Sequence, residues 1–150
     1  MPISIELVPF DTICEHKDFF NLVDEYIDET ANDAIPSPGP QVNAYKALDE
    51  RGVLRCVAIL DGESLAGLAL ATVTPSQHYP YPILALDSLF LRKPWRKGRL
   101  GLDLLGAVRA LAKREGAPGF VIMAPPGSKL ERLCERFGYV NTHKAYWCKA

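Results

Sequence analysis

The stretch from Leu84 to Glu115, LALDSLFLRKPWRKGRLGLDLLGAVRALAKRE, joins a strand pattern, a basic turn and a helix pattern. A nearly continuous apolar run from Ile83 to Leu91 is typical of a strand covered on both faces. We expect the strand to end before Pro94, because proline cannot donate a hydrogen bond to a sheet. Apolar residues then recur at three- and four-residue spacing from Gly101 to Ala112. This spacing predicts an amphipathic helix, and Gly116 supplies its end.

The turn between strand and helix reads Trp95-Arg96-Lys97-Gly98-Arg99-Leu100-Gly101. The start of a helix leaves backbone N–H groups without intrahelical partners, and these groups, with the helix dipole, attract anions such as phosphate. Arginine and lysine side chains add charge-assisted hydrogen bonds. The turn therefore predicts a pyrophosphate site. The alternative is an ordinary strand–helix connection with solvated cations.

Strand, turn and helix together resemble the acyl-CoA-binding motif of the GNAT superfamily, the N-acyltransferases that use acetyl-CoA. The family pattern in the turn is Gln/Arg-x-x-Gly-x-Gly/Ala. Arg96 and Gly101 match it, whereas Arg99 stands where the first glycine usually is and Gly98 lies one residue earlier. The resemblance implies acetyl-CoA as co-substrate. It implies contacts from Leu89, Phe90, Leu91, Arg96, Lys97, Gly98, Arg99, Leu100, Gly101 and Leu102.

The order of the other predicted elements strengthens this resemblance. We expect strands at 3–8, 53–60, 65–74 and 119–124, helices at 16–30, 41–51 and 129–137, a proline-rich loop at 34–40, and closing strands from Tyr139 with Val140, Tyr146 and Trp147 in the core. The order β-α-α-β-β-β-α-β-α-β is similar to the GNAT arrangement along nearly the whole chain. It implies a single α/β domain over residues 1–150. Its mixed, twisted, mostly antiparallel sheet would have about six to seven strands, with helices on both faces.

Composition narrows the class of protein. The 150 residues are 48% hydrophobic and 23% charged, as in an ordinary globular domain, and the net charge of −1 argues against a general nucleic-acid binder. No apolar run is long enough to span a bilayer, and the N-terminus lacks the basic region of a signal peptide. The four cysteines have no paired metal-ligand spacing. We therefore expect free thiols in a reducing, cytoplasmic setting, and no metal site.

Asp87 is the candidate catalytic base. N-acyl transfer needs a neutral amine, a polarised thioester carbonyl and a proton for the leaving thiolate. A carboxylate in an apolar strand is costly unless it is paired, solvated or protonated, which makes Asp87 a functional candidate. The resemblance adds that many GNAT proteins carry an acidic residue at this place, and that backbone N–H groups from Leu89 to Leu91 polarise the carbonyl. The alternative is a structural aspartate bonded to a loop amide.

Cys134 is the candidate for the general acid that protonates the leaving thiolate. The segment Leu130 to Tyr139, LERLCERFGY, resembles the late helix of the family, in which many members carry a tyrosine where this chain has Cys134. A thiol with a pKa of ~8.5 could protonate the leaving thiolate, but poorly. The alternative is that Cys134 only belongs to the core.

The acceptor is not readable from these patterns: a small amine, a peptide N-terminus and a lysine all stay open. An acidic run lies on and just after the predicted helix at 16–30: Asp24, Glu25, Asp28, Glu29 and Asp33. It is either a solvated helix face or a negatively charged surface that attracts a cationic amine substrate. The aromatics of the loop 75–82 either line a substrate mouth or pack a turn. Two further functions compete with acetyl transfer: a non-catalytic CoA-binding relative, and a nucleic-acid contact module built on the basic turn. A homodimer is compatible with the sequence.

Overall fold

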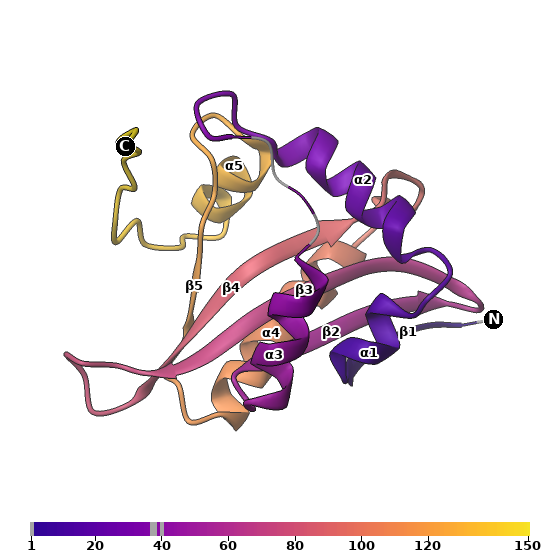
Figure 1. Cartoon of the computed structure of the whole chain (residues 1–150), viewed down its shortest axis with the longest axis horizontal. Coiled ribbons are helices and arrows are strands. Elements are labelled where there is room, and N and C mark those ends of the chain that lie inside the picture. The colour runs from indigo at the N-terminus through magenta and orange to yellow at the C-terminus, as the bar shows by residue number, and fades with distance from the viewer. Residues whose placement is uncertain (1, 37–38, 40) are drawn as a thin grey trace.

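The computed structural model describes residues 2–36, 39 and 41–150, and its centre is a five-stranded sheet (Figure 1). The strands are β1 (Ile3–Val8), β2 (Leu54–Asp61), β3 (Ser64–Pro75), β4 (Pro82–Leu91) and β5 (Phe120–Ile122). They lie in the order β1-β2-β3-β4-β5, and every neighbouring pair is antiparallel except β4 and β5, which are parallel. The predicted fold class, a mixed and mostly antiparallel sheet, is confirmed.

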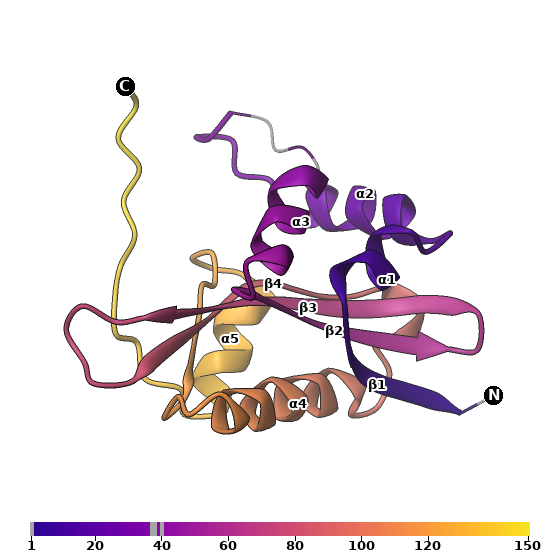
Figure 2. The ribbon, with the colours of Figure 1, turned by 60° about the horizontal axis from the view of Figure 1, so that its bottom comes forward.

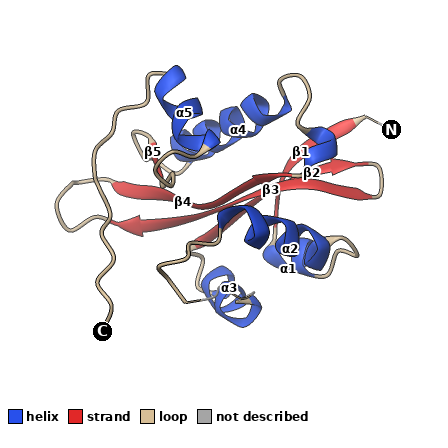
Figure 3. Ribbon diagram, turned by 90° about the horizontal axis from the view of Figure 1, so that it is seen from above, coloured by secondary structure: helices blue, strands red, loops and turns tan. Residues whose placement is uncertain are grey.

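Helices cover both faces of this sheet (Figures 2 and 3). On one face, here called the α2 face, lie α1 (Phe10–Cys14), α2 (Phe19–Thr30) and α3 (Val42–Glu50). On the other, the α4 face, lie α4 (Leu100–Arg114) and α5 (Lys129–Arg136), and a short 3₁₀ turn, η1 (Lys93–Trp95), precedes α4. Each face has its own apolar core, because alternate side chains of a strand point to opposite sides of the sheet.

A β-bulge interrupts the alternation in β4. In the pairing with β3, Leu70 lies opposite Ser88 and Ala71 lies opposite Leu86, so Asp87 is an extra residue on β4. Before the bulge, Leu84 and Leu86 belong to the core of the α4 face, while Phe90 after it belongs to the core of the α2 face. The extra residue thus turns Asp87 and Ser88 toward the α2 face without disrupting either core.

Gly62, Gly116 and Ser128 each have the structural role that is usual for their residue type. Gly62, in the two-residue loop between β2 and β3, has a φ of +58°, which glycine adopts without strain. At the end of α4, Gly116 donates to Lys113 O and Ala117 donates to Ala112 O, which is a Schellman motif. Ser128 caps α5 by accepting a hydrogen bond from the Glu131 N–H (3.1 Å).

Two predictions about the elements need correction, and part of a third is not tested. The helix predicted from His16 begins at Phe19, because residues 15–18 form a turn in which His16 Nδ1 accepts a hydrogen bond from the Asp18 N–H (3.1 Å). The short helix α1 was not predicted. The sheet has five strands in the described chain instead of six to seven. Residues 37, 38 and 40 of the predicted 34–40 loop lie outside the described residues.

The predicted closing strand is wrong. From Tyr139 onward the chain has no regular secondary structure, and it runs away from the sheet as an extended segment (Figure 2). The expected core residues Val140, Tyr146 and Trp147 are 82%, 86% and 55% exposed. Polar residues interrupt both alternating faces of this segment, so neither face offers a continuous apolar surface to bury.

Candidate active site

The sheet opens where β5 ends. β5 pairs with β4 only from Leu84 to Leu86, and β4 continues to Leu91 without a described neighbour on that edge. On the opposite edge, the Arg92 N–H donates to Ala66 O of β3 (2.9 Å). Because N–H groups alternate between the two edges of a strand, those of Leu89 and Leu91 face the opening. Unpaired backbone donors therefore point into the gap between β4 and β5.

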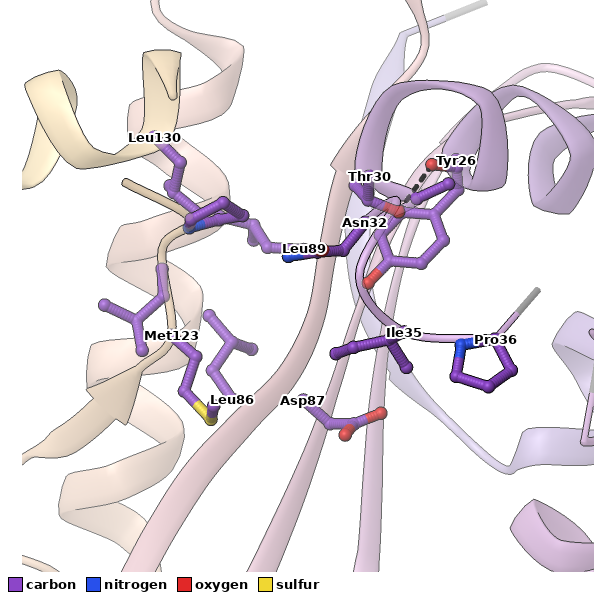
Figure 4. Close-up of a pocket in the computed structure, with 13 residues that line it drawn as sticks. Tyr26, Thr30, Asn32, Ile35, Pro36, Leu86, Asp87, Leu89, Met123 and Leu130 are labelled. Carbon is purple, nitrogen blue, oxygen red and sulfur yellow. Dashed lines mark hydrogen bonds between the residues drawn. The ribbon is translucent and has the colours of Figure 1, made fainter. Parts of the chain in front are cut away.

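A cavity of about 310 Å³ lies at this opening (Figure 4). One wall comes from the α2 face, through Tyr26 and Ile35. The other comes from the end of β5 and from α5, through Met123 and Leu130, and β4 contributes the floor. Because its walls come from both helix layers, the cavity connects the two faces of the sheet through the gap between the strands.

Asp87 projects from the bulge into this cavity (Figure 4). Its Oδ2 atom accepts hydrogen bonds from the Tyr45 hydroxyl (2.5 Å) and from Ser88 Oγ (3.3 Å), whereas Oδ1 has no partner among the described residues. The partners of the carboxylate are two side-chain hydroxyls and not a loop amide. One carboxylate oxygen is thus held by the protein, and the other is available to a ligand.

Tyr45 is a site residue that the sequence did not reveal. Its place in the apolar stripe of the 41–51 helix is that of an ordinary core aromatic, yet its hydroxyl reaches Asp87 across 42 positions of the chain. Burial, reinforced by the hydrogen bond to the Asp87 carboxylate, raises the pKa of Tyr45 well above its ordinary value. The phenol therefore stays protonated and keeps donating to the carboxylate.

A second cavity, of about 230 Å³, adjoins the first on the α2 face. Tyr26 and Asp87 line both cavities, so these two side chains mark the boundary between them. The second cavity lies between β3 and β4 and the helices α1, α2 and α3, and its lining includes Ile27, Val42 and Tyr45. Tyr26, like Tyr45, lies among the apolar positions of its helix, and nothing in the sequence distinguishes it from a core aromatic.

The basic turn leads from β4 into the N-terminus of α4. Trp95 anchors it by donating to the Asp61 carboxylate (2.9 Å), and Gly98 has a φ of +70°. The first amide of α4 with an intrahelical acceptor is that of Asp103, so the three before it, from Leu100 to Leu102, have none. A Cβ on Gly101 would lie 4.0 Å from Leu91, which leaves the approach to these amides open. Exposed Lys97 and Arg99 lie in the same turn. Amides, glycine and cations together fit a pyrophosphate group.

Arg96, the residue that matches the family motif, is held elsewhere in this structure. Its guanidinium donates to Leu91 O (2.6 Å) and to Glu29 of α2 (2.7 Å), and it lies 5.2 Å from the centre of the Phe90 ring. Arg92 is similarly bonded to Glu25 (2.8 Å). Glu25 and Glu29 are therefore ion-paired with the segment that follows β4, which argues against a role for these two carboxylates in attracting a cationic amine. Asp24, Asp28, Glu29 and Asp33 are exposed, as expected of a solvated face.

Two other candidates lie outside the cavities. Cys134 is on α5 but lines neither cavity, although Leu130 of the same helix lines the first. Burial raises the pKa of Cys134 above its ordinary value, which weakens it further as an acid. In the loop 76–81, Tyr79 and Tyr81 stack on each other (5.4 Å), which agrees with turn packing, and neither lines a cavity. No group of three or more His, Cys, Asp or Glu in the described chain could hold a metal ion.

Solved structures with the same arrangement of elements come from acetyltransferases. A ribosomal-protein-alanine N-acetyltransferase from Brucella melitensis biovar Abortus 2308 superposes with a TM-score of 0.76, at 12% identity over 100% of both chains. The aminoglycoside N-acetyltransferase AAC(6′)-Iy, in complex with a bisubstrate CoA analogue, gives 0.74 at 14% identity, over 100% of this chain and 99% of that one. A GNAT family acetyltransferase of Staphylococcus aureus gives 0.71 at 14% identity over 100% of both chains.

The chain has the GNAT fold. The likeness covers the whole chain. No protein-family model matches the sequence, and no curated protein is significantly similar to it. At 10 to 16% identity, the likeness shows the fold alone. Among the described residues, no helix combines the length and apolarity that crossing a bilayer requires.

Proposed function

We propose that this protein is an N-acetyltransferase that moves an acetyl group from acetyl-CoA to a primary amine by direct attack in a ternary complex. The observation that supports the proposal most is the composition of the first cavity. It holds the Asp87 carboxylate, one of whose oxygens is unengaged, beside Leu89, whose N–H faces the gap between β4 and β5. A proton acceptor for an amine and a donor for a carbonyl oxygen thus share one space that both faces of the sheet can reach.

Acetyl-CoA, when bound, supplies the thioester carbonyl that the amine attacks. Asp87 Oδ1 takes a proton from the amine, directly or through a water, while Tyr45 and Ser88 hold the other carboxylate oxygen in place. The Leu89 N–H donates to the carbonyl oxygen, on which negative charge develops. The three unpaired amides from Leu100 to Leu102, with Lys97 and Arg99, bind the pyrophosphate.

The leaving thiolate needs little help from the protein. A CoA thiolate is a good leaving group that water can protonate, and Cys134 lines neither cavity. Tyr26, whose hydroxyl points toward the first cavity, is the one tyrosine among the described residues that line this cavity (Figure 4). We assign Cys134 at most a minor part in proton transfer, and Asp87 the principal one.

Asp87→Asn tests this assignment. The amide cannot accept the proton, so kcat/KM for a confirmed amine should fall by roughly 10²- to 10⁴-fold, while CoA affinity hardly changes. Cys134→Ala, the matched comparison, should cost about tenfold or less. Release of CoA thiol is measured against pH, with the reactivity of exposed Cys148 subtracted. An Asp87→Asn enzyme with an unchanged pH profile would exclude Asp87 as the base.

A second candidate function is CoA binding without catalysis. Two observations favour it: Arg99 replaces the first glycine of the motif, and Cys134, which stands where many GNAT proteins carry a tyrosine, lines neither cavity. The same assay separates the two functions, because a binding protein would bind CoA and release no thiol with any amine.

A further inference from the structure

The two cavities that meet at Asp87 carry almost no charge. Asp87 is the only acidic or basic residue among the described residues that line either of them. The rest of the lining is mostly apolar, with Ile35, Leu86 and Met123 in the first cavity and Ile27, Val42 and Leu70 in the second. An occupant therefore finds one site for an ammonium group and apolar walls around it.

The neighbouring carboxylates are engaged elsewhere. Glu25 and Glu29 pair with the arginines that follow β4, Asp18 accepts the Leu65 N–H, and Asp49 accepts the Phe10 N–H (3.0 Å). None of these four lines a cavity. A second ammonium group on the same ligand would find no carboxylate there, and burying an unpaired charge is costly.

Most polar groups of the lining also have partners. Thr30 Oγ1 donates to Tyr26 O (2.7 Å), Asn32 Oδ1 accepts from the Ala34 N–H (2.9 Å), and the Tyr45 and Ser88 hydroxyls both donate to Asp87. A peptide or a sugar would bring several amides or hydroxyls that need new partners in this space. An apolar body needs none, and it gains from leaving water.

We propose that the acceptor is a small monoamine with an apolar body, such as an arylalkylamine or a branched alkylamine. The inference rests on the proposed function and names the substrate class of the same site. The ammonium group lies at Asp87 Oδ1 and the body occupies the second cavity, on the side of the sheet opposite the cofactor turn. A volume of about 230 Å³ has room for one ring or a short branched chain, and it is smaller than the usual site of a drug-sized ligand.

The first experiment compares amines that differ in charge and polarity. Phenethylamine and isoamylamine represent the proposed class; putrescine, spermidine, kanamycin and a peptide with a free N-terminus represent the others. With acetyl-CoA saturating, kcat/KM for the two monoamines should exceed that for the polyamines and kanamycin by at least about 100-fold. A preference for a polycation or for the peptide would overturn the class while leaving acetyl transfer intact.

Gln41→Glu provides a matched variant. Gln41 is an exposed residue of the second cavity at the N-terminus of α3, where a carboxylate of the same shape is tolerated. The change adds a second anion to the wall, so kcat/KM for putrescine should rise at least about tenfold relative to phenethylamine. An unchanged ratio would show that the amine body does not enter the second cavity.

Measurements of amine binding test the proposed substrate class separately from the proposed transferase activity. Calorimetry with the same amines, in the presence of CoA, needs no turnover. Phenethylamine that binds to the native protein, binds at least about tenfold more weakly to Asp87→Asn and is never acetylated would uphold the class and refute the transferase. Two results would overturn the proposed substrate class. In one, spermidine or kanamycin binds and neither monoamine does; in the other, no amine binds at all.

Discussion

Gly67 of β3 has its Cα against the backbone of β4. It lies opposite Leu91, and a Cβ at this position would stand 2.6 Å from Phe90 O and 3.2 Å from Leu91 Cα. A backbone carbonyl in a central strand cannot move aside as a flexible side chain can. Gly67→Ala should therefore lower the free energy of unfolding by about 1–3 kcal/mol, measured by denaturant titration.

Gly106→Ala is the control for Gly67→Ala. Gly106 lies in the middle of α4, and a Cβ there would meet no atom within 4 Å. Alanine should raise the free energy of unfolding by about 0.5–1 kcal/mol, because it lowers the conformational entropy of the unfolded chain. A loss of stability of the same size in both variants would contradict the assigned cause.

Asp87 and Tyr45 show which site residues a sequence can reveal. Asp87 is noticeable because it is a charged residue in an apolar run, and this contrast needs no tertiary information. Its orientation depends on the bulge opposite Leu70 and Ala71, for which the run LALDSLFL gives no local signal. Tyr45 has the spacing of a core aromatic, and only the packing of α3 over β4 gives its hydroxyl a partner. Residues that act across elements are therefore the ones that periodicity misses.

At the scale of elements, the segment that follows β4 is joined to α2 by ion pairs. Arg96 bonds both to Glu29 and to the last carbonyl of β4, whereas Arg99 is exposed and pairs only with Asp103 one turn along α4 (3.4 Å). Arg96→Ala should cost about 1 kcal/mol of stability, because it removes hydrogen bonds to Leu91 O and to Glu29, although water can reach both acceptors. Arg99→Ala should change stability by less than about 0.5 kcal/mol.

The effects of these two substitutions on CoA affinity should have the opposite order: Arg99→Ala should weaken CoA binding more than Arg96→Ala does. Arg99 lies next to the unpaired amides of α4, while Arg96 is already engaged by α2. Fluorescence or calorimetric titration with CoA measures the difference on two folded variants. A larger loss of CoA affinity in Arg96→Ala would mean that Arg96 leaves Glu29 when CoA binds.

The C-terminal segment is the element for which sequence and structure disagree most. Tyr139 still contacts the body of the protein, with its ring 6.0 Å from that of Phe120, but Val140, Tyr146 and Trp147 are exposed. Deleting residues 140–150 should therefore change the free energy of unfolding by less than about 1 kcal/mol. A loss of several kcal/mol in thermal or denaturant unfolding would restore the closing strand that the sequence predicted.

At the scale of the whole molecule, the order of elements was more informative than any single motif. The turn departs from the family pattern at Arg99, yet the succession of strands and helices predicts a mixed sheet covered on both faces. This holds because β2, β3 and β4 follow one another through short connections and pair antiparallel, which leaves few alternative arrangements. The cavities could not be predicted, because they are bounded by side chains from α2, α3, β4 and α5 that no local pattern brings together.

The response of the whole fold to CoA tests the site without an acceptor. A ligand that binds only the native state stabilises it by RT ln(1 + [L]/Kd), which is about 2.7 kcal/mol at 100 times Kd. For a domain of this length, that corresponds to a rise in Tm of roughly 5–10 °C.

The rise should vanish in Gly101→Val, because the branched side chain covers the approach to the unpaired amides of α4. The Tm of the same variant without ligand should hardly change, since a Cβ at this position lies 4.0 Å from Leu91, at ordinary contact distance. Differential scanning fluorimetry with millimolar CoA measures both values. A native protein that shows no shift would exclude pyrophosphate binding by this turn, and an equal shift in Gly101→Val would place the anion elsewhere on the molecule.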